Sequence, residues 1–198
     1  MVFVRAAVTA SILLLAQGGV PSARAADVAG RFALEGAGIA DCSRFAQAYA
    51  EGSDETLLFA GWVHGYVSAF NQLQPDTFDI VPWQEADLLL ASLADYCASN
   101  TGIRFFDAVG AMIRLLVADR ITAQSPVVEI RTHEGAIRLY ETTIAAVKAK
   151  LNAAGFDAGA PGAAFDESAS KALAAFQAQR GLAATGLPDQ ATLKALLY

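Results

Sequence analysis

Apolar residues recur every three or four positions through most of the chain after residue 40, which is the spacing of one face of an α-helix. The clearest case begins at Ser53, where Leu58, Trp62, Tyr66, Ala69 and Leu73 form one stripe. The same spacing predicts further helices over residues 42–50, 84–98, 104–121, 137–154, 166–180 and 189–197. We therefore expect a mainly all-α fold.

Residues typical of helix ends support several of these boundaries. Asp41, Asp166 and Asp189 stand where a side chain can accept a hydrogen bond from the first turn of the following helix. Gly155 and Gly181 follow the last apolar positions of two helices, where a left-handed backbone is common. The last 60 residues thus predict three short helices in a small bundle.

Residues 125–135 interrupt the helical pattern. Ser125 and Pro126 break the preceding helix, and a short β-prone stretch follows at Val127, Val128, Ile130 and Thr132. The stretch is either a lone strand or an extended linker, and its role cannot be read from the sequence.

The first 25 residues have the pattern of a secretory signal peptide. Arg5 precedes an apolar stretch that ends near Ala16, and Ala23-Arg24-Ala25 fits a signal peptidase site. The stretch is too short for a membrane span, which needs about 20 residues, although an uncleaved anchor remains the alternative. No later apolar run approaches that length without charges, so we expect an exported, periplasmic chain with no stable membrane insertion.

Export gives the two cysteines a redox context. Cys42 and Cys97 are most simply one structural disulfide, because an oxidising compartment favours pairing. A zinc site would need ligands beyond these thiols and the distant His64 and His133, and a redox-active pair normally lies closer in sequence.

The charges divide the mature chain into two parts. Residues 26–135 hold six Arg and fifteen acidic residues, a net charge of -9, whereas residues 136–198 hold six basic and five acidic residues, a net charge of +1. We predict a helical domain over 26–124, a linker or short strand over 125–135 and a second domain over 136–198. Neither part has the basic stripe that a nucleic acid requires.

The longest predicted helix also carries small residues at Gly61, Gly65 and Ala69. The spacing indicates either tight packing against a neighbouring helix or a groove, floored by glycine and walled by Trp62 and Tyr66, that receives a partner's side chain. We take Trp62, Gly65, Tyr66 and Asn71 as the candidate partner-binding residues. The acidic loop from Asn71 to Trp83 lacks the ligand spacing of a calcium site and is better explained as a solvated turn.

Three segments of the first half resemble known exported helical proteins. They are Cys42, the stretch Trp62-Val-His-Gly-Tyr-Val-Ser-Ala-Phe-Asn71, and Tyr96-Cys97-Ala-Ser-Asn100. The pattern resembles the HdeA-like group and the immunity proteins that neutralise type VI secretion amidases. This resemblance implies a periplasmic protective binding protein with a disulfide-braced helical bundle and no catalytic apparatus.

The last third carries a more specific pattern. The matching segments are Val147-Lys-Ala-Lys-Leu-Asn-Ala-Ala-Gly-Phe156, Ala174-Ala-Phe-Gln-Ala-Gln-Arg-Gly-Leu182 and Thr185-Gly-Leu-Pro-Asp-Gln-Ala-Thr-Leu193. In this order they resemble the type 1 peptidoglycan-binding domain, a three-helix module that attaches exported proteins to the cell wall. The resemblance implies peptidoglycan as a binding partner.

The loop Gly162-Ala163-Ala164-Phe165-Asp166 departs from the Asp-Gly-x-Phe-Gly pattern common in that family, and the departure can weaken ligand binding without changing the fold. The polar candidates for contact with peptidoglycan are Gln177, Arg180, Thr185 and Asp189, although roles in the fold or on a bare surface are the simpler explanation for each.

No arrangement of residues indicates catalysis. Ser168, Ser170, His64 and His133 form no recognised triad motif, and no cofactor or metal is implied. We expect a noncatalytic protein. Either it is held on peptidoglycan while the helical domain binds another periplasmic protein, or it is a soluble periplasmic chaperone or amidase inhibitor whose C-terminal bundle does not bind the wall.

Overall fold

The computed structural model describes residues 26–162 and 164–198, so the predicted signal peptide lies outside the described residues. The chain divides into two units, with the boundary between Ala33 and Leu34. In the described part of the first unit, the Asp27 carboxylate accepts hydrogen bonds from the backbone N–H groups of Ala29 and Arg31. The same carboxylate pairs with the Arg31 guanidinium.

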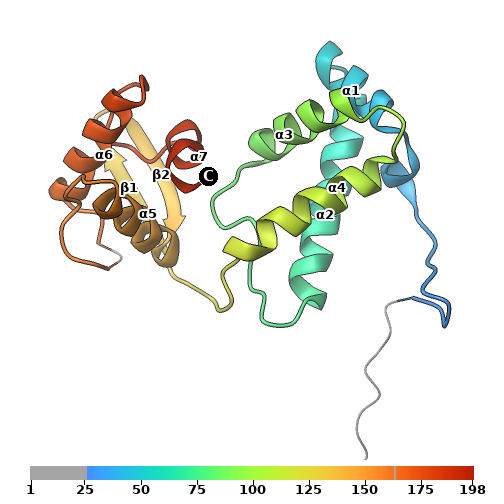
Figure 1. Ribbon diagram of the computed structural model, residues 1–198, viewed down its shortest axis with the longest axis horizontal. Helices are drawn as coiled ribbons and strands as arrows, with labels where there is room; N and C mark the ends of the chain where they lie inside the picture. Colours follow the sequence, from blue (N-terminus) through green and yellow to red (C-terminus); the bar gives the residue numbers. More distant parts are fainter. Residues whose placement is uncertain (1–25, 163) are drawn as a thin grey trace, which may run out of the picture. The chain divides into compact units, whose positions relative to one another are not determined.

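The second unit is mainly helical, as the sequence predicted (Figure 1). Two short 3-10 helices, η1 and η2, lie before α1 and after α4. In chain order the elements are η1 (Gly36–Ile39), α1 (Cys42–Glu51), α2 (Glu55–Leu73), α3 (Ala86–Ser99), α4 (Phe105–Leu116), η2 (Val117–Asp119), β1 (Val127–Thr132), β2 (Gly135–Tyr140), α5 (Glu141–Ala153), α6 (Glu167–Gln179) and α7 (Gln190–Leu197).

Helices α1 to α4 enclose a first hydrophobic core. Its centre is aromatic: the ring centroid of Phe45 lies 5.1 Å from that of Phe59 and 4.6 Å from that of Phe105. The predicted disulfide is confirmed, and it joins Cys42 at the start of α1 to Cys97 near the end of α3. Both cysteines are fully buried. The bond therefore fixes two helices at the core itself.

The buried face of α2 is not the predicted stripe. Phe59, Val63 and Val67 enter the core, whereas the side chains of Leu58 and Leu73 are 68% and 73% exposed. Both sets have helical spacing, because α2 is apolar around most of its circumference. Periodicity alone therefore did not identify the face that packs.

A β-hairpin replaces the start of the predicted helix over 137–154. Strands β1 and β2 are antiparallel, with Ile130 opposite Ile137 and Val128 opposite Leu139. Ile130 and Leu139 are buried, so the hairpin contributes one face to a core. The β-prone stretch is thus a paired strand, and helix α5 begins only at Glu141.

Helices α5, α6 and α7 build the second core with this hairpin. Its fully buried aliphatic residues include Ile144 and Leu151 from α5, Leu173 from α6 and Leu193 from α7. Two predicted caps are confirmed at its helix starts: Asp166 accepts from the N–H of Ala169 (3.0 Å) and Asp189 from that of Thr192 (2.8 Å). Asp41 precedes α1 but makes no such side-chain hydrogen bond.

Trp83 belongs to the second core although it lies between α2 and α3 in the chain. Its ring centroid is 5.2 Å from that of Tyr198, and its carbonyl oxygen accepts a hydrogen bond from Gln190 Nε2 (2.6 Å). Gln84 Nε2 donates to the Tyr198 hydroxyl (2.8 Å). The segment before α3 is therefore fixed to α7 and the C-terminal residue.

Within the described ranges, no helix is both long enough and apolar enough to cross a lipid bilayer.

Replacement of both cysteines tests how much the disulfide stabilises the fold. It closes a loop of 55 residues, and the loss of chain entropy in the unfolded state predicts stabilisation of about 4 kcal/mol. We expect the double variant Cys42→Ala/Cys97→Ala to lose free energy of unfolding of that order in urea denaturation followed by circular dichroism. Equal midpoints for the variant and the oxidised parent protein would contradict this estimate.

Candidate functional site

Gln177 is the hydrogen-bonding centre of the segment between α6 and α7. Its side chain is fully buried. Nε2 lies 2.8 Å from Thr192 Oγ1, 2.9 Å from the carbonyl oxygen of Leu187 and 3.2 Å from Thr185 Oγ1, and it donates toward these three acceptors. Oε1 accepts from the backbone N–H of Gly186 (2.8 Å). One buried amide thus supplies hydrogen-bond partners to several polar groups of the loop that joins α6 and α7.

Thr185 and Asp189 act in the same loop. The Thr185 hydroxyl oxygen accepts from the N–H of Leu187 (3.1 Å), and the Asp189 carboxylate caps α7. Gly186 has a φ of +67°, and a Cβ there would lie 2.9 Å from the Ser170 carbonyl oxygen. A larger residue at this position would therefore disturb the contact between α6 and the loop.

Arg180 is the predicted candidate that faces solvent. It follows the last turn of α6, and its guanidinium carbon lies 5.3 Å from the centre of the Phe176 ring. This is the geometry of a cation–π contact. Among the described residues its guanidinium has no ion pair, so its N–H groups are available to an external acceptor.

The loop before α6 is anchored near α6, at Ala164 and Phe165. The buried ammonium of Lys148 donates to the Ala164 carbonyl oxygen (3.0 Å), and Phe165 packs against the second core. The hydrogen bond from the Ala169 N–H lowers the pKa of Asp166, with a further contribution from the positive charge of Lys148. In the sequence, Lys148 is distinguished only by its position among the apolar residues of α5. That position alone does not indicate a functional role.

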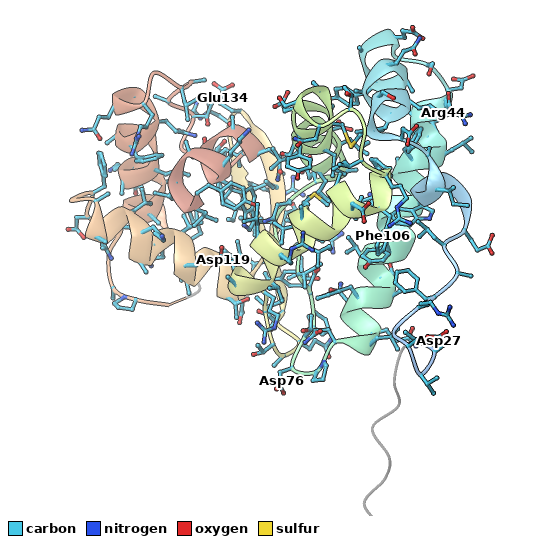
Figure 2. The ribbon with its side chains drawn as sticks, turned by 45° about the vertical axis from the view of Figure 1, so that its right-hand side comes forward. Asp27, Arg44, Asp76, Phe106, Asp119 and Glu134 are labelled. Atoms are coloured by element: carbon cyan, nitrogen blue, oxygen red, sulfur yellow. A yellow bond between two sulfur atoms is a disulfide. The ribbon has the colours of Figure 1, made fainter. Side chains whose placement is uncertain are left out.

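The N-terminal candidates are brought together only in part. Trp62 and Tyr66 stack with their ring centroids 5.3 Å apart, and Phe106, labelled in Figure 2, lies edge-on to Tyr66 at 5.8 Å. The Trp62 indole donates to the Glu35 carbonyl oxygen (2.9 Å). These two aromatic residues thus form one half-buried cluster.

The glycines of α2 do not pack tightly. A Cβ built on Gly61 or Gly65 would meet no described atom within 4 Å, so the packing explanation for these residues is wrong. The close approach to Trp62 comes instead from Gly38 in η1, where a Cβ would lie 2.7 Å from the indole Cε2 atom. Trp62 therefore needs glycine on the facing segment, not on its own helix.

Asn71 orders the acidic loop. Its Oδ1 accepts from the N–H of Ile80 (3.0 Å), and its Nδ2 donates to the Asp79 carboxylate (3.2 Å). Asp79 also accepts from the N–H of Val81 (2.9 Å) and lies 3.4 Å from the Tyr140 hydroxyl. The proximity of this carboxylate and burial raise the pKa of Tyr140, burial being the larger cause.

Three of the four residues considered for catalysis have other partners. Ser168 donates to the Asp157 carbonyl oxygen (3.3 Å) and Ser170 to that of Gly186 (3.2 Å), while His133 lies beside Glu134 at the hairpin turn. The described ranges contain no group of three or more His, Cys, Asp or Glu side chains arranged to hold a metal ion.

Substitution of Gln177 tests its structural role. Gln177→Met keeps the approximate volume but removes the hydrogen-bond partners of the buried Gly186 N–H and the Thr192 hydroxyl. We expect a loss of about 3 kcal/mol in free energy of unfolding, measured in urea, because each buried unsatisfied group costs about 1–3 kcal/mol. Gln179→Met, at an exposed position two residues away, is the control and should change stability by less than about 0.5 kcal/mol. Equal stability of both variants would show that the network contributes nothing.

Comparison with known proteins supports the interpretation of the C-terminal segment. Searches of the curated proteins and of the solved structures found no match. The resemblance of the first half to HdeA-like and immunity proteins thus stays a prediction. Residues 141–196, which contain α5, α6 and α7, match the model of the family described as "Putative peptidoglycan binding domain". The predicted resemblance of this segment to peptidoglycan-binding domains is therefore confirmed.

Proposed function

We propose that this protein is an exported, noncatalytic protein that binds peptidoglycan through its C-terminal bundle and another periplasmic protein through its N-terminal helices. The observation that carries the proposal is the family match, because it spans α5 to α7. The hydrogen bonds of the buried Gln177 and the cap at Asp189 also support the proposal, because they hold the matched segment in a folded form. The division into residues 26–124, 125–135 and 136–198 is part of this proposal.

Two features favour a location outside the cytoplasm. The buried disulfide between Cys42 and Cys97 needs an oxidising compartment to form and persist. The pattern of residues 1–25 is that of a secretory signal peptide. Export to the periplasm would bring the protein into contact with peptidoglycan.

Arg180 is the residue we assign to direct contact with the polymer. Peptidoglycan stem peptides carry carboxylates, and a guanidinium offers several N–H donors to such a group. Thr185 and Asp189 lie on the same loop, but their oxygens already accept backbone hydrogen bonds. Gln177 stabilises the loop from the protein interior, since its side chain is fully buried.

The proposed face for a protein partner lies beside Trp62. A pocket of about 590 Å³ is lined by Trp62, Leu58, Ile39 and the ion pair between Arg44 and Glu55. Leu58 and Ile39 are more than half exposed. Apolar side chains next to an aromatic ring are typical of the centre of a protein interface.

Co-sedimentation with purified sacculi at moderate salt tests peptidoglycan binding. The intact mature chain, residues 26–198, is the appropriate sample, because a cut after residue 135 would separate β1 from β2. We expect the chain to pellet with sacculi and Arg180→Gln to bind about tenfold more weakly, which is the loss of about one charge-assisted hydrogen bond.

Arg114→Gln is the matched control for charge. Arg114 is an exposed residue of α4, outside the matched segment, so its loss should leave pelleting unchanged. If the parent chain stays in the supernatant, the C-terminal match reflects fold alone. A soluble periplasmic chaperone or amidase inhibitor would then be the better description.

A further inference from the structure

A small cavity lies beside α5, outside the Arg180 loop. Its volume is about 140 Å³, and its apolar wall includes Pro82, Trp83 and Leu197. Four polar residues also line it, and Thr143, Lys150 and Asp119 are three of them. Asp119 ends η2 and is labelled in Figure 2. Pro82, Trp83 and Asp119 lie outside the segment that matches the family, so part of the cavity wall comes from the rest of the chain.

Thr143 gives the cavity an unused hydrogen-bonding group. The residue is 4% exposed, and its hydroxyl is a buried side-chain polar atom that has no hydrogen-bond partner among the described residues. Such a group costs about 1–3 kcal/mol when it stays unsatisfied. A ligand atom that pairs with this hydroxyl would remove that cost, so the cavity favours a polar occupant.

Two opposite charges accompany the hydroxyl. Lys150 and Asp119 are both exposed residues, and neither forms an ion pair with another described residue. Lys150 differs in this from Lys148 on the same helix, whose buried ammonium donates to Ala164. The lining thus offers one ammonium and one carboxylate, both available.

The spacing along α5 places these groups in one row. Thr143, Ala146 and Lys150 are three and four residues apart, so they share a face of the helix. The small side chain of Ala146 lies between the two polar ends and leaves room above the helix. Seven residues of helix span about 10 Å, which suits a ligand with separated polar groups.

We propose that this cavity binds the zwitterionic end of an amino acid, with its carboxylate toward Lys150, its ammonium toward Asp119 and a polar atom on the Thr143 hydroxyl. A volume of about 140 Å³ is below that of whole-ligand pockets, about 300–1,000 Å³, and suits an end group with a short aliphatic stem. If the proposed function holds, the source is the diaminopimelate residue of a stem peptide, which carries both charges on one carbon. The other source is a free amino acid.

Titration of the intact mature chain with meso-diaminopimelate, followed by NMR, tests the chemistry. Pimelate lacks the ammonium groups of this probe, and 1,5-diaminopentane lacks its carboxylates. We expect meso-diaminopimelate to bind in the millimolar range and each reduced probe to bind at least about tenfold more weakly, because each loses one charged contact. Binding of pimelate as tight as that of meso-diaminopimelate would overturn the proposal.

Two variants assign the binding to this cavity. Thr143→Val keeps the shape and removes only the unpartnered hydroxyl, so the fold should be as stable or more stable while affinity for meso-diaminopimelate falls about tenfold. Lys150→Met should weaken binding similarly, whereas Lys194→Met, at an exposed position on α7, should not. Unchanged affinity in both cavity variants would overturn the proposal.

Sacculus co-sedimentation of Thr143→Val separates the two sources and the two proposals. A parallel loss of sacculus and probe binding supports the stem peptide, and loss of probe binding alone supports a free amino acid. A parent chain that binds the probe but not sacculi supports the cavity and removes the proposed function. A chain that binds sacculi but not the probe overturns the cavity proposal alone.

Discussion

The contact between Trp83 and the C-terminal helix is the constraint on which the rest of this arrangement depends. Trp83 precedes α3, yet its ring is buried in the core formed by α5, α6 and α7. Two hydrogen bonds stabilise the same contact: Gln190 of α7 donates to the Trp83 carbonyl, and Gln84 donates to the Tyr198 hydroxyl. Because of this contact, the wall of the cavity beside Thr143 is made by both halves of the chain.

The sequence predicted the helices best where polar residues marked their ends. Asp166 and Asp189 begin α6 and α7 as expected, and both accept the capping hydrogen bond. The hairpin was missed because Ile137 and Leu139 have a spacing of two, while Ile144, Val147 and Leu151 continue with a spacing of three and four. Read together as one window, these residues hide the change of period at Tyr140.

The choice of face in α2 shows a different limit. Two apolar stripes run along this helix, and only the position of its neighbours decides that Phe59 and Val63 are buried while Leu58 is exposed. The glycine pattern failed for a related reason. Space above Gly61 and Gly65 is open, whereas the restriction at Trp62 is imposed by Gly38, which is distant in sequence and carries no periodic signal. Contacts of this kind arise from tertiary structure and cannot be read from local spacing.

The C-terminal candidates show why a family pattern identifies a module more readily than its ligand contacts. Gln177, Thr185 and Asp189 belong to the pattern, and their side chains stabilise the α6–α7 loop and the start of α7. A residue committed to the fold has little hydrogen-bonding capacity left for a polymer. The ligand contacts proposed for this protein therefore use polar groups without a hydrogen-bond partner among the described residues: the Arg180 guanidinium, and the Thr143 hydroxyl with its two neighbouring charges. Such groups stand out only after every other polar atom has been assigned a partner, which requires the structure.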